Sequence, residues 1–571
     1  MSSGSTGSFI PKWQMAILLG APIAIGLGYL YYRNQATRLT EDTTDSKAKK
    51  KIDSKDKSIS LDGDDKLPDT RDQIQSVLNE AILYKSEGNQ YFQKGKFNEA
   101  IKSYDKAIET CPQSKTYDLA TFHQNRAAAY EKLNKWQKVK EDCTKAIELH
   151  SRYIKAYSRR ARVNEMSDDL FASLEDITAT CILEGFQNSA SLVFADRVLK
   201  ELGRRDAKTA FTTREQIIPS TNFLKAYFAS YTTDPVKAEY DIGDWQKGFG
   251  RAKKAFDVDD FGNIISACTE EIETDGKYKL LAILLRGTMH LVAGALNEAL
   301  NDFNIIIDGS DVPLELKVNA LIKRASLHIQ NEKSEESFVD FATAEKLNSK
   351  NADIYHQRGQ VYLLLDQLDE ALSDFNRAIE LAPDFPASHV QKCYVEYRHA
   401  ILLQNQLQIY KAIQAARTIA DKFPDNIEVC NILAQILTEQ QQFDKADELF
   451  SKAIELQPKH AAIYVHRGLL YLQWNGEIDK ALECLNKAIE VDDKCELAYE
   501  TLGTIQVQRG RLNEAIELFE KALKLCRSET EMVHIYSLRN AAIAQLNVAR
   551  KLNLDLNALT SGQPIDPLIV R

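Results

Sequence analysis

Residues 352–385 read ADIYHQRGQVYLLLDQLDEALSDFNRAIELAPDF, and this stretch shows how the chain is built. When it is numbered 1 to 34, small residues stand at positions 8, 20 and 27, and aromatic residues stand at positions 11 and 24. The apolar residues recur every three or four positions, which is the period of an amphipathic helix. A proline at position 32 stops the second of two such helices. The stretch therefore predicts two helices that approach closely where small residues face large ones.

The same spacing recurs along most of the chain. Clear copies start at residues 81, 280, 427 and 496, weaker copies start at 120, 154 and 318, the copy at 461 has one extra turn residue, and residues 386–426 form a stretched copy. A 34-residue period of this kind is typical of the tetratricopeptide repeat, a pair of antiparallel helices. One repeat cannot bury its own apolar faces, so repeats stack into a solenoid with a concave binding surface. We therefore predict an all-α tetratricopeptide-repeat superhelix.

The copies fall into two arrays, because the pattern is poor between residues 188 and 255. Solenoids need capping elements with a polar outer face, so we expect a helix after each array. The expected parts are a short tail (1–9), one transmembrane helix (10–32), a flexible charged linker (33–78), an N-terminal three-repeat unit with a capping helix (79–205), a junction with a degenerate repeat (206–275), a C-terminal array (276–530), and a capping helix with a tail (531–571).

The segment from Trp13 to Tyr32 carries no charge and is long enough to span a bilayer as a helix. Only Lys12 precedes it closely, whereas Arg33, Arg38 and a lysine run follow it. Since positive residues stay in the cytosol, this asymmetry favours an uncleaved anchor over a secretory signal peptide. The scattered cysteines and the absence of an N-x-[ST] sequon also indicate a reducing compartment. We predict that most of the chain faces the cytosol.

Small residues recur every four positions in this segment, at Ala16, Gly20, Ala24 and Gly28. Such a stripe allows two membrane helices to pack closely, which would give a homodimer. The alternative is that membrane helices are rich in glycine and alanine in any case.

Charge and motifs argue against nucleic-acid binding and against catalysis. The net charge is -10, whereas phosphate contacts need a basic surface. The sequence contains no phosphate loop, no H-E-x-x-H, no C-x-x-C and no G-x-S-x-G. The acidic run at 62–65 lacks the rest of a calcium loop. We predict a protein that is not an enzyme and needs no cofactor or metal.

Hydrogen-bond donors occupy positions 2, 5, 6 and 9 of the first three repeats. They are Lys85, Asn89, Asn125, Lys155 and Arg159. Residues four apart share one helical face, so these side chains should converge from three successive first helices. A peptide ending in aspartate presents two carboxylates close together, and charge-assisted hydrogen bonds to them are strong. Five such bonds at ~1.5–3 kcal/mol each, offset by association costs of ~4–15 kcal/mol, predict a reversible micromolar interaction.

The later copies lack this set of donors, which confines the predicted site to the N-terminal repeats. At the same positions the copy at 352 has Asp353, His356, Gln357 and Gln360. The C-terminal copies instead carry apolar residues at positions 5, 9 and 12. They are Leu284, Leu291, Ile322, Ile329, Leu363, Val465, Leu469 and Leu472. An apolar groove of this kind would suit extended hydrophobic segments, and the alternative is that these residues pack helix on helix.

The five donors resemble the two-carboxylate clamp of chaperone-binding tetratricopeptide domains. The whole chain resembles the family of large tetratricopeptide receptor subunits of the mitochondrial outer-membrane protein translocase, fungal type. The stretches SEGNQYFQKGKFNEAIKSYDKAIE at 86–109 and NRAAAYEKL at 125–133 are especially similar.

The resemblance implies docking of the seventy- and ninety-kilodalton heat-shock chaperones through a terminal Glu-Glu-Val-Asp. It implies that hydrophobic preproteins with internal targeting signals, such as carriers, pass to the C-terminal array for transfer to the translocase pore. It also implies contacts with other translocase subunits at the outer mitochondrial membrane. The remaining alternatives are a membrane-anchored co-chaperone scaffold and an import receptor of the endoplasmic reticulum.

Overall fold

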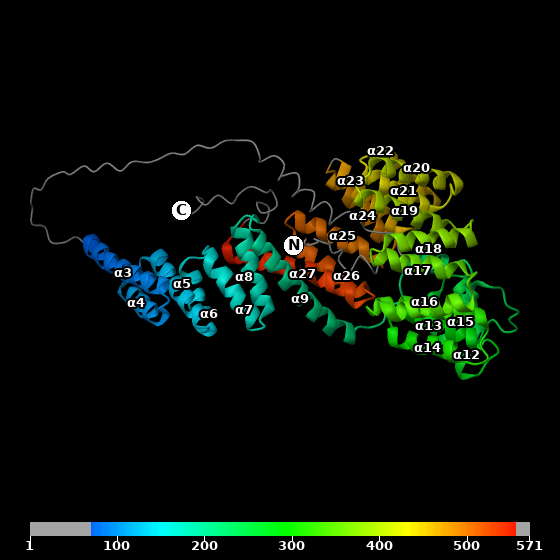
Figure 1. Ribbon diagram of the computed structural model, residues 1–571, viewed down its shortest axis with the longest axis horizontal. Helices are drawn as coiled ribbons and strands as arrows, with labels where there is room; N and C mark the ends of the chain where they lie inside the picture. The colour runs from blue at the N-terminus through cyan, green and yellow to red at the C-terminus, as the bar shows by residue number, and fades with distance from the viewer. Residues whose placement is uncertain (1–69, 475, 555–571) are drawn as a thin grey trace, which may run out of the picture. The chain divides into compact units, whose positions relative to one another are not determined.

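The computed structural model describes residues 70–474 and 476–554 (Figure 1). These residues form α-helices and two short 3-10 helices, and no strand occurs among them. The predicted all-α fold class is therefore confirmed. No helix in the described ranges is long and apolar enough to cross a membrane. The predicted anchor at 10–32 and the linker up to residue 69 lie outside the described residues.

The three predicted N-terminal repeats are three helix pairs that follow one another along the chain (Figure 1). The pairs are α3 (Thr70–Gln93) with α4 (Phe97–Thr110), α5 (Thr116–Lys132) with α6 (Trp136–Leu149), and α7 (Ile154–Met166) with α8 (Leu170–Leu183). The long helix α9 (Ser189–Thr213) follows them, where a capping helix was expected.

The rest of the chain begins with α10 (Thr221–Ala229) and a 3-10 turn, η1 (Pro235–Lys237), which belong to no repeat. The helices that follow are α11 (Gly248–Asp257), η2 (Phe261–Asn263), α12 (Ile264–Glu273), α13 (Lys279–Val292), α14 (Leu296–Asp308), α15 (Leu314–Gln330), α16 (Ser334–Leu347), α17 (Ala352–Leu364), α18 (Leu368–Leu381), α19 (Pro386–Leu402), α20 (Gln406–Lys422), α21 (Ile427–Glu439), α22 (Phe443–Leu456), α23 (Ala461–Trp474), α24 (Ile478–Val491), α25 (Glu496–Gln508), α26 (Leu512–Leu525) and α27 (Glu529–Leu552). The stretched copy at 386–426 is a pair of longer helices, α19 and α20.

The described helices group into two compact units. The C-terminal unit comprises Ala207–Gly503 and Leu518–Ile535. The N-terminal unit comprises the described parts of Asn34–Asp206 and Tyr536–Arg571, together with Thr504–Glu517. The second half of α27 thus belongs to the N-terminal unit, where Asn547 donates to Glu175 of α8 at 2.8 Å.

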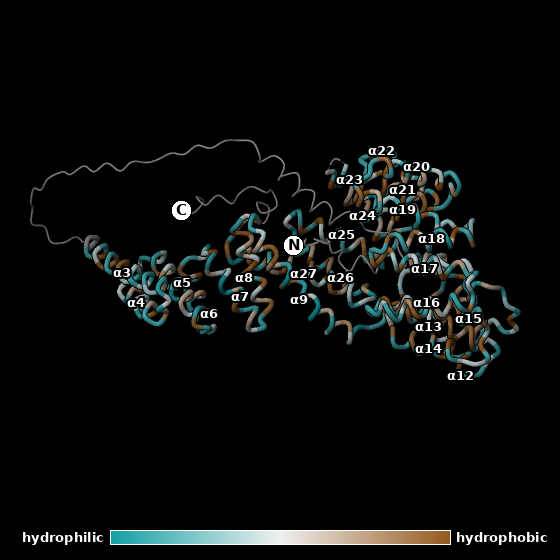
Figure 2. The backbone as a smooth tube through the Cα atoms, viewed as in Figure 1, coloured by the Kyte–Doolittle hydropathy of each residue, from teal (hydrophilic) through white to brown (hydrophobic). Residues whose placement is uncertain are grey.

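Close packing at position 8 explains the glycine found there. A Cβ added to Gly359 would lie 2.9 Å from the ring of Phe375, and one added to Gly88 would lie 2.6 Å from the ring of Tyr104. Ala371 at position 20 is fully buried. Figure 2 shows hydrophobic and hydrophilic stretches alternating along the helices. The predicted close approach of small to large residues is confirmed.

In eight of the repeats, the turn between the two helices passes through the left-handed region of backbone space at position 15. The residues with positive φ are Gly95, Asn134, Asp168, Gly294, Glu332, Asp366, Gln441 and Gly510. Glycine, asparagine and aspartate tolerate this conformation best. Six of the eight residues are of these types and could have marked the turn in the sequence, whereas Glu332 and Gln441 give no such signal by residue type.

Two histidines are buried in the C-terminal unit in their neutral form. His356 is fully buried, with Nδ1 3.0 Å from the Ser388 hydroxyl. His466 is almost fully buried, with Nδ1 2.6 Å from the Gln435 amide nitrogen. Burial lowers the pKa of each histidine from 6.5 to about 3. Between about pH 6.5 and pH 3, both histidines therefore stay neutral in the folded unit but are protonated in the unfolded chain.

The stability of the C-terminal unit should consequently fall as the pH drops below about 6.5. Below this pH, each histidine should lower the free energy of unfolding by about 1.4 kcal/mol per pH unit, which gives about 2 kcal/mol per histidine at pH 5. Urea unfolding at pH 7 and pH 5 measures this loss. The double variant His356→Gln/His466→Gln should show a clearly smaller difference, and an equal difference in both proteins would contradict the prediction.

Candidate peptide-binding site

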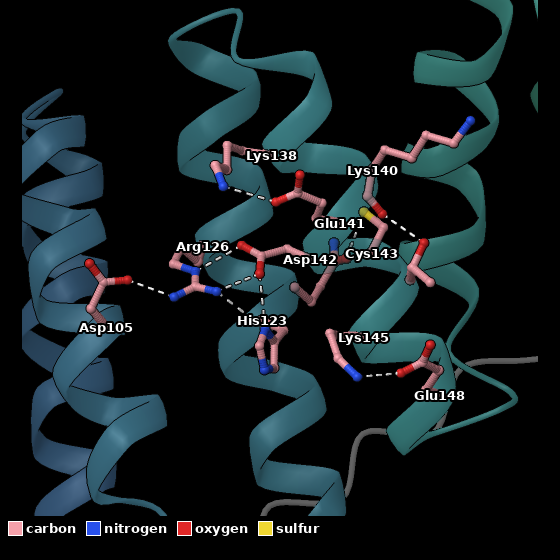
Figure 3. A network of polar contacts seen from close by, with 12 residues as sticks. Asp105, His123, Arg126, Lys138, Lys140, Glu141, Asp142, Cys143, Lys145 and Glu148 are labelled. Carbon is pink, nitrogen blue, oxygen red and sulfur yellow. Dashed lines mark hydrogen bonds and ion pairs between the residues drawn. The ribbon is translucent and has the colours of Figure 1, made fainter.

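Arg126 forms hydrogen bonds that connect three helices of the N-terminal repeats (Figure 3). Arg126 on α5 donates from Nε and Nη2 to both carboxylate oxygens of Asp142 on α6, at 2.8 and 2.6 Å. Its Nη1 donates to Asp105 on α4, in the preceding repeat, at 2.6 Å. Burial alone would raise the pKa of Asp142, but hydrogen bonds from Arg126 and His123 outweigh it and lower the pKa. The paired charges therefore connect α5 to α6 within the repeat and to α4 of the preceding repeat.

The same pair recurs at positions 7 and 23 of four other repeats. The pairs are Arg160–Asp176, Arg286–Asp302, Arg324–Asp340 and Arg358–Asp374. In each, the remaining guanidinium nitrogen reaches a side chain before the repeat, namely Thr144, Thr269, Asn304 and Glu345. The sixteen-residue spacing of arginine and aspartate is visible in the sequence and is a signal from which these pairs could have been predicted.

These pairs also orient two of the predicted site residues. Asn125 directly precedes Arg126, and Arg159 directly precedes Arg160. Successive residues on a helix are turned by about 100° from one another. Once the arginine at position 7 is fixed, the side chain at position 6 leaves the helix in a fixed direction.

Asn89 and Asn125 come together from the first and second repeats. Asn125 Nδ2 donates to Asn89 Oδ1 at 3.3 Å, and the Tyr104 hydroxyl donates to the same oxygen at 2.8 Å. Both amides are half-buried. The Asn89 oxygen is therefore occupied, while its NH₂ group donates to no residue that the structure describes. This arrangement leaves amide donors available to a ligand that accepts hydrogen bonds.

Arg159 is held by the helix that carries Asn125. Its Nε donates to Glu131 of α5 at 2.8 Å, and its side chain is 18% exposed. Its Nη1 is buried and has no hydrogen-bond partner among the described residues. A buried donor without a partner is costly and calls for an explanation. Glu131 thus orients the guanidinium and leaves hydrogen-bonding capacity for a carboxylate, which reaches the buried Nη1 once the side chain shifts.

The two predicted lysines make no hydrogen bond or ion pair with any described residue. Lys85 on α3 is half-buried, and Lys155 on α7 is exposed. Asn89 and Asn125 are thus in direct contact, and Arg159 contacts the helix of Asn125 through Glu131. The two lysines remain available for a ligand. Together these residues stay a predicted site.

The predicted apolar groove of the C-terminal copies is not exposed in the structure. Leu284, Leu291, Ile322, Ile329, Leu363, Val465 and Leu469 are buried, and only Leu472 of the eight is half-buried. The expectation of an open apolar surface at the seven buried positions is therefore wrong. Four of them, at 284, 291, 322 and 329, belong to one hydrophobic core with residues from α10 and η1.

One part of this core is the strap, which we define as residues 221–237. Its buried members include Leu224, Tyr227, Tyr231 and Val236, which share a core with Leu284. The strap carries no repeat pattern and comes from the predicted junction. It therefore belongs to the core in which four of the predicted groove residues are buried.

A fully buried ion pair fixes the strap to the repeats. Lys323 Nζ lies 2.8 Å from Asp234 Oδ2, and both side chains are 0% exposed. Lys323 also donates to the Thr288 hydroxyl at 3.1 Å and lies 5.7 Å and 5.2 Å from the ring centres of Phe228 and Tyr231. Burial lowers the pKa of Lys323, and Asp234 opposes this effect.

A buried carboxylate and an amide hold the strap further along. Asp353 accepts from the backbone and hydroxyl of Thr232, both at 2.7 Å, and from those of Thr233, both at 3.2 Å. Gln357 Nε2 donates to the Ser230 carbonyl at 3.1 Å. Lys323 and Gln357 stand at position 6 of their repeats and Asp353 stands at position 2, so they use positions that carry the predicted donors in the N-terminal repeats.

Matches to the tetratricopeptide repeat cover residues 352–385, 427–460 and 459–528, and a TPR repeat match covers 88–134. The first two have the same bounds as the copies found in the sequence. In the described ranges, no group of three or more His, Cys, Asp or Glu side chains is arranged to hold a metal ion. The repeat matches and the paired helices define a tetratricopeptide-repeat protein.

The chain is 42% identical over 569 residues to the mitochondrial import receptor subunit TOM70 of Homo sapiens, covering 95% of this chain and 93% of the human protein. It is 27% identical over 516 residues to TOM70 of Saccharomyces cerevisiae (strain ATCC 204508 / S288c), covering 82% and 80%. A crystal structure of the yeast Tom70 covers 83% of this chain and 99% of that chain, at 25% identity and a TM-score of 0.46. By its likeness to the human receptor, the chain belongs to the TOM70 family of mitochondrial import receptor subunits.

Proposed function

We propose that the N-terminal repeats dock the anionic C-terminus of a heat-shock chaperone of the seventy- or ninety-kilodalton class. Lys85, Asn89, Asn125, Lys155 and Arg159 bind its terminal carboxylates. The observation that carries the proposal is the convergence of amides from two repeats, in which Asn125 contacts Asn89 at 3.3 Å. The unpaired Nη1 of Arg159 supports it, because this donor lacks a partner until a ligand supplies one.

The strap supports the same assignment by showing what these positions do elsewhere in the chain. In the C-terminal repeats, Lys323 at position 6 binds the carboxylate of Asp234. In the N-terminal repeats, Arg159 holds the equivalent position without a carboxylate from a strap. A basic side chain at position 6 is thus placed to bind a carboxylate within this fold. Arg159 uses its Nε for Glu131, and the partner's carboxylate binds the rest of the guanidinium.

The proposal extends to the whole chain. Residues 10–32 anchor it in the outer mitochondrial membrane, and the bulk of the chain faces the cytosol. The C-terminal unit accepts hydrophobic preproteins, such as carriers with internal targeting signals, and passes them to other translocase subunits and the pore. Membership of the import-receptor family supports this localisation over the endoplasmic reticulum. A co-chaperone scaffold is less well supported, because the strap occupies the equivalent positions of the C-terminal repeats.

A peptide ending in Glu-Glu-Val-Asp should bind the full-length chain with micromolar affinity. The same peptide with an amidated C-terminus should bind at least ~10-fold more weakly, because one of the two terminal carboxylates is lost. Raising the ionic strength should weaken the first peptide more than the second, since screening acts on charge. Titration calorimetry measures both affinities, and equal affinities for the two peptides would exclude a carboxylate clamp.

A further inference from the structure

The hairpin of α19 and α20 projects beyond the hairpins on either side of it. Each of its two helices has 17 residues, whereas α17, α18, α21 and α22 have 13 or 14. Asp366, in the turn of the preceding repeat, pairs with Arg398 at 3.2 Å. Gln440, in the turn of the following repeat, donates to the Tyr397 hydroxyl at 2.8 Å. The neighbouring turns thus end at the level of these two residues of α19. Residues 399–410, which we call the prong, extend about one helical turn further, or ~6 Å.

The prong exposes large apolar side chains at its tip. Ile401, Leu402, Leu403, Leu407 and Tyr410 are 42% to 63% exposed. They follow one another around a single turn between two helices, so they form one surface. Single exposed apolar residues are ordinary on a protein, but a contiguous group of them marks an interaction surface. We therefore looked for the kind of partner that this surface fits.

The charges around the prong favour a lipid surface. Residues 399–410 contain no Asp, Glu, Lys or Arg, whereas the neighbouring turns carry Asp366 and Glu439. The first charged residues on either side of the prong are both basic, Arg398 on α19 and Lys411 on α20. Basic residues are attracted to anionic headgroups, and tyrosine is enriched at the interface between headgroups and acyl chains. An apolar tip with this surrounding is typical of a segment that enters a bilayer interface.

A protein partner fits the prong less well than a bilayer does. Stable interfaces between proteins use ~20–30 residues a side, whereas the prong offers five large exposed side chains. The prong is also convex, because it projects past both neighbouring turns, and it offers no groove to a helix or an extended peptide. A bilayer needs no complementary shape, since lipid molecules rearrange around the side chains that enter.

The membrane is within reach of the prong. In the function proposed above, residues 10–32 anchor the chain in a bilayer. Residues 33–69, between the anchor and α3, span at most ~130 Å when fully extended. A segment tethered in this way meets the membrane at a high effective concentration, so a weak individual contact is sufficient for docking.

We propose that the prong inserts its apolar tip into the cytosol-facing leaflet of the membrane that anchors the chain. Leu402, Leu403 and Leu407 enter the apolar layer, Tyr410 lies at the interface, and Lys411 contacts the headgroups. The C-terminal unit thereby gains its own contact with the bilayer, in addition to the anchor at the other end of the chain. This inference rests on the membrane anchor of the proposed function and adds a second site of membrane contact to it.

A photoreactive residue at the tip identifies what the prong contacts. p-Benzoylphenylalanine is introduced in place of Leu402 in the full-length chain, which is reconstituted in vesicles of phosphatidylcholine and phosphatidylserine with radiolabelled acyl chains. Irradiation should attach labelled lipid to the protein. The matched control carries the same residue in place of Val339, which is 64% exposed on α16 of the same unit. This control should give only background labelling.

A double substitution tests whether the apolar side chains hold the prong in the bilayer. In the chain labelled at Leu402, Leu403→Gln/Leu407→Gln should reduce the lipid adduct to the background of the Val339 control, because two of the inserting side chains become polar. Ile305→Gln/Val339→Gln changes two exposed apolar residues of the same unit outside the prong and should leave the adduct unchanged. All four side chains are exposed, so both variants should keep the unfolding midpoint of the unchanged chain.

The remaining outcomes contradict the proposal in different ways. A crosslink to a second copy of the chain, seen as a product of twice the mass, would identify the prong as a self-association surface instead. No adduct above the Val339 control would exclude docking of the prong. Flotation of the same vesicles distinguishes these failures from failure of the anchor. A chain that floats without a lipid adduct contradicts the prong alone, whereas a chain that does not float with the vesicles contradicts the anchor and the prong together.

Discussion

Replacing Asp234 by asparagine should lower the free energy of unfolding of the C-terminal unit by about 3–5 kcal/mol. Asparagine keeps the shape of the side chain and the oxygen that accepts from Val236 N at 3.0 Å. It removes the charge opposite Lys323, whose side chain is fully buried. An unpaired buried ammonium group must either stay charged in an apolar site or give up its proton, and both outcomes cost stability.

The size of this effect distinguishes the strap from an ordinary surface contact. Urea unfolding followed by circular dichroism measures the change at pH 7. Glu490→Gln, which breaks an exposed pair on the same unit, should leave the unfolding midpoint unchanged. If Asp234→Asn behaves like this control, the strap does not fix the repeats in the way the buried pair indicates.

A second substitution isolates the charge from the packing. Changing Lys323 to methionine in the Asp234→Asn variant removes the stranded cation and keeps an unbranched chain of similar length. Breaking a buried pair is costly mainly because it leaves one charge buried without a partner, and removing that second charge as well removes this cost. The double variant should therefore recover most of the lost stability, whereas a further loss would show that Lys323 acts mainly through its contacts with Thr288 and the aromatic rings.

The strap is also the clearest limit on what the sequence predicts. Repeat positions are visible because Gly359 and Phe375 must meet inside one repeat, and this need is local. The partners of Asp234 and Thr232 lie 89 and 121 residues away, at Lys323 and Asp353. No periodicity connects residues at such distances when one of them lies outside the repeats. The predicted groove failed partly for the same reason, since four of its residues are buried in a core that includes the non-repeating strap.

The candidate clamp was easier to predict because it depends only on position within a repeat. Residues at positions 5, 6 and 9 of successive first helices lie on the same side of stacked repeats, so Asn89 and Asn125 could be expected to approach. The sequence does not show which acceptor each donor of the clamp binds within the chain. Glu131, which holds Arg159, follows from the packing of α5 against α7 and from no motif.

Replacing Arg159 by alanine should weaken binding of a Glu-Glu-Val-Asp peptide by at least ~100-fold. A guanidinium can make two parallel hydrogen bonds to one carboxylate, each worth ~1.5–3 kcal/mol, and ~2.8 kcal/mol corresponds to a hundredfold change. Lysine at this position keeps the charge but loses the paired geometry, so Arg159→Lys should lose ~10-fold. Titration calorimetry with the full-length chain measures both variants.

Arg162 provides the matched control for this prediction. It lies on the same helix, is 58% exposed, and approaches the same Glu131 at 3.7 Å. Arg162→Ala removes an equal charge from α7 without removing the unpaired Nη1, so peptide affinity should stay within about twofold, as for exposed charges generally. Equal losses in the two variants would mean that the peptide responds only to the overall charge of α7. A large loss of peptide affinity in Arg159→Ala alone would show that a peptide carboxylate contacts the Arg159 guanidinium. A general effect of charge would instead be the same for both arginines.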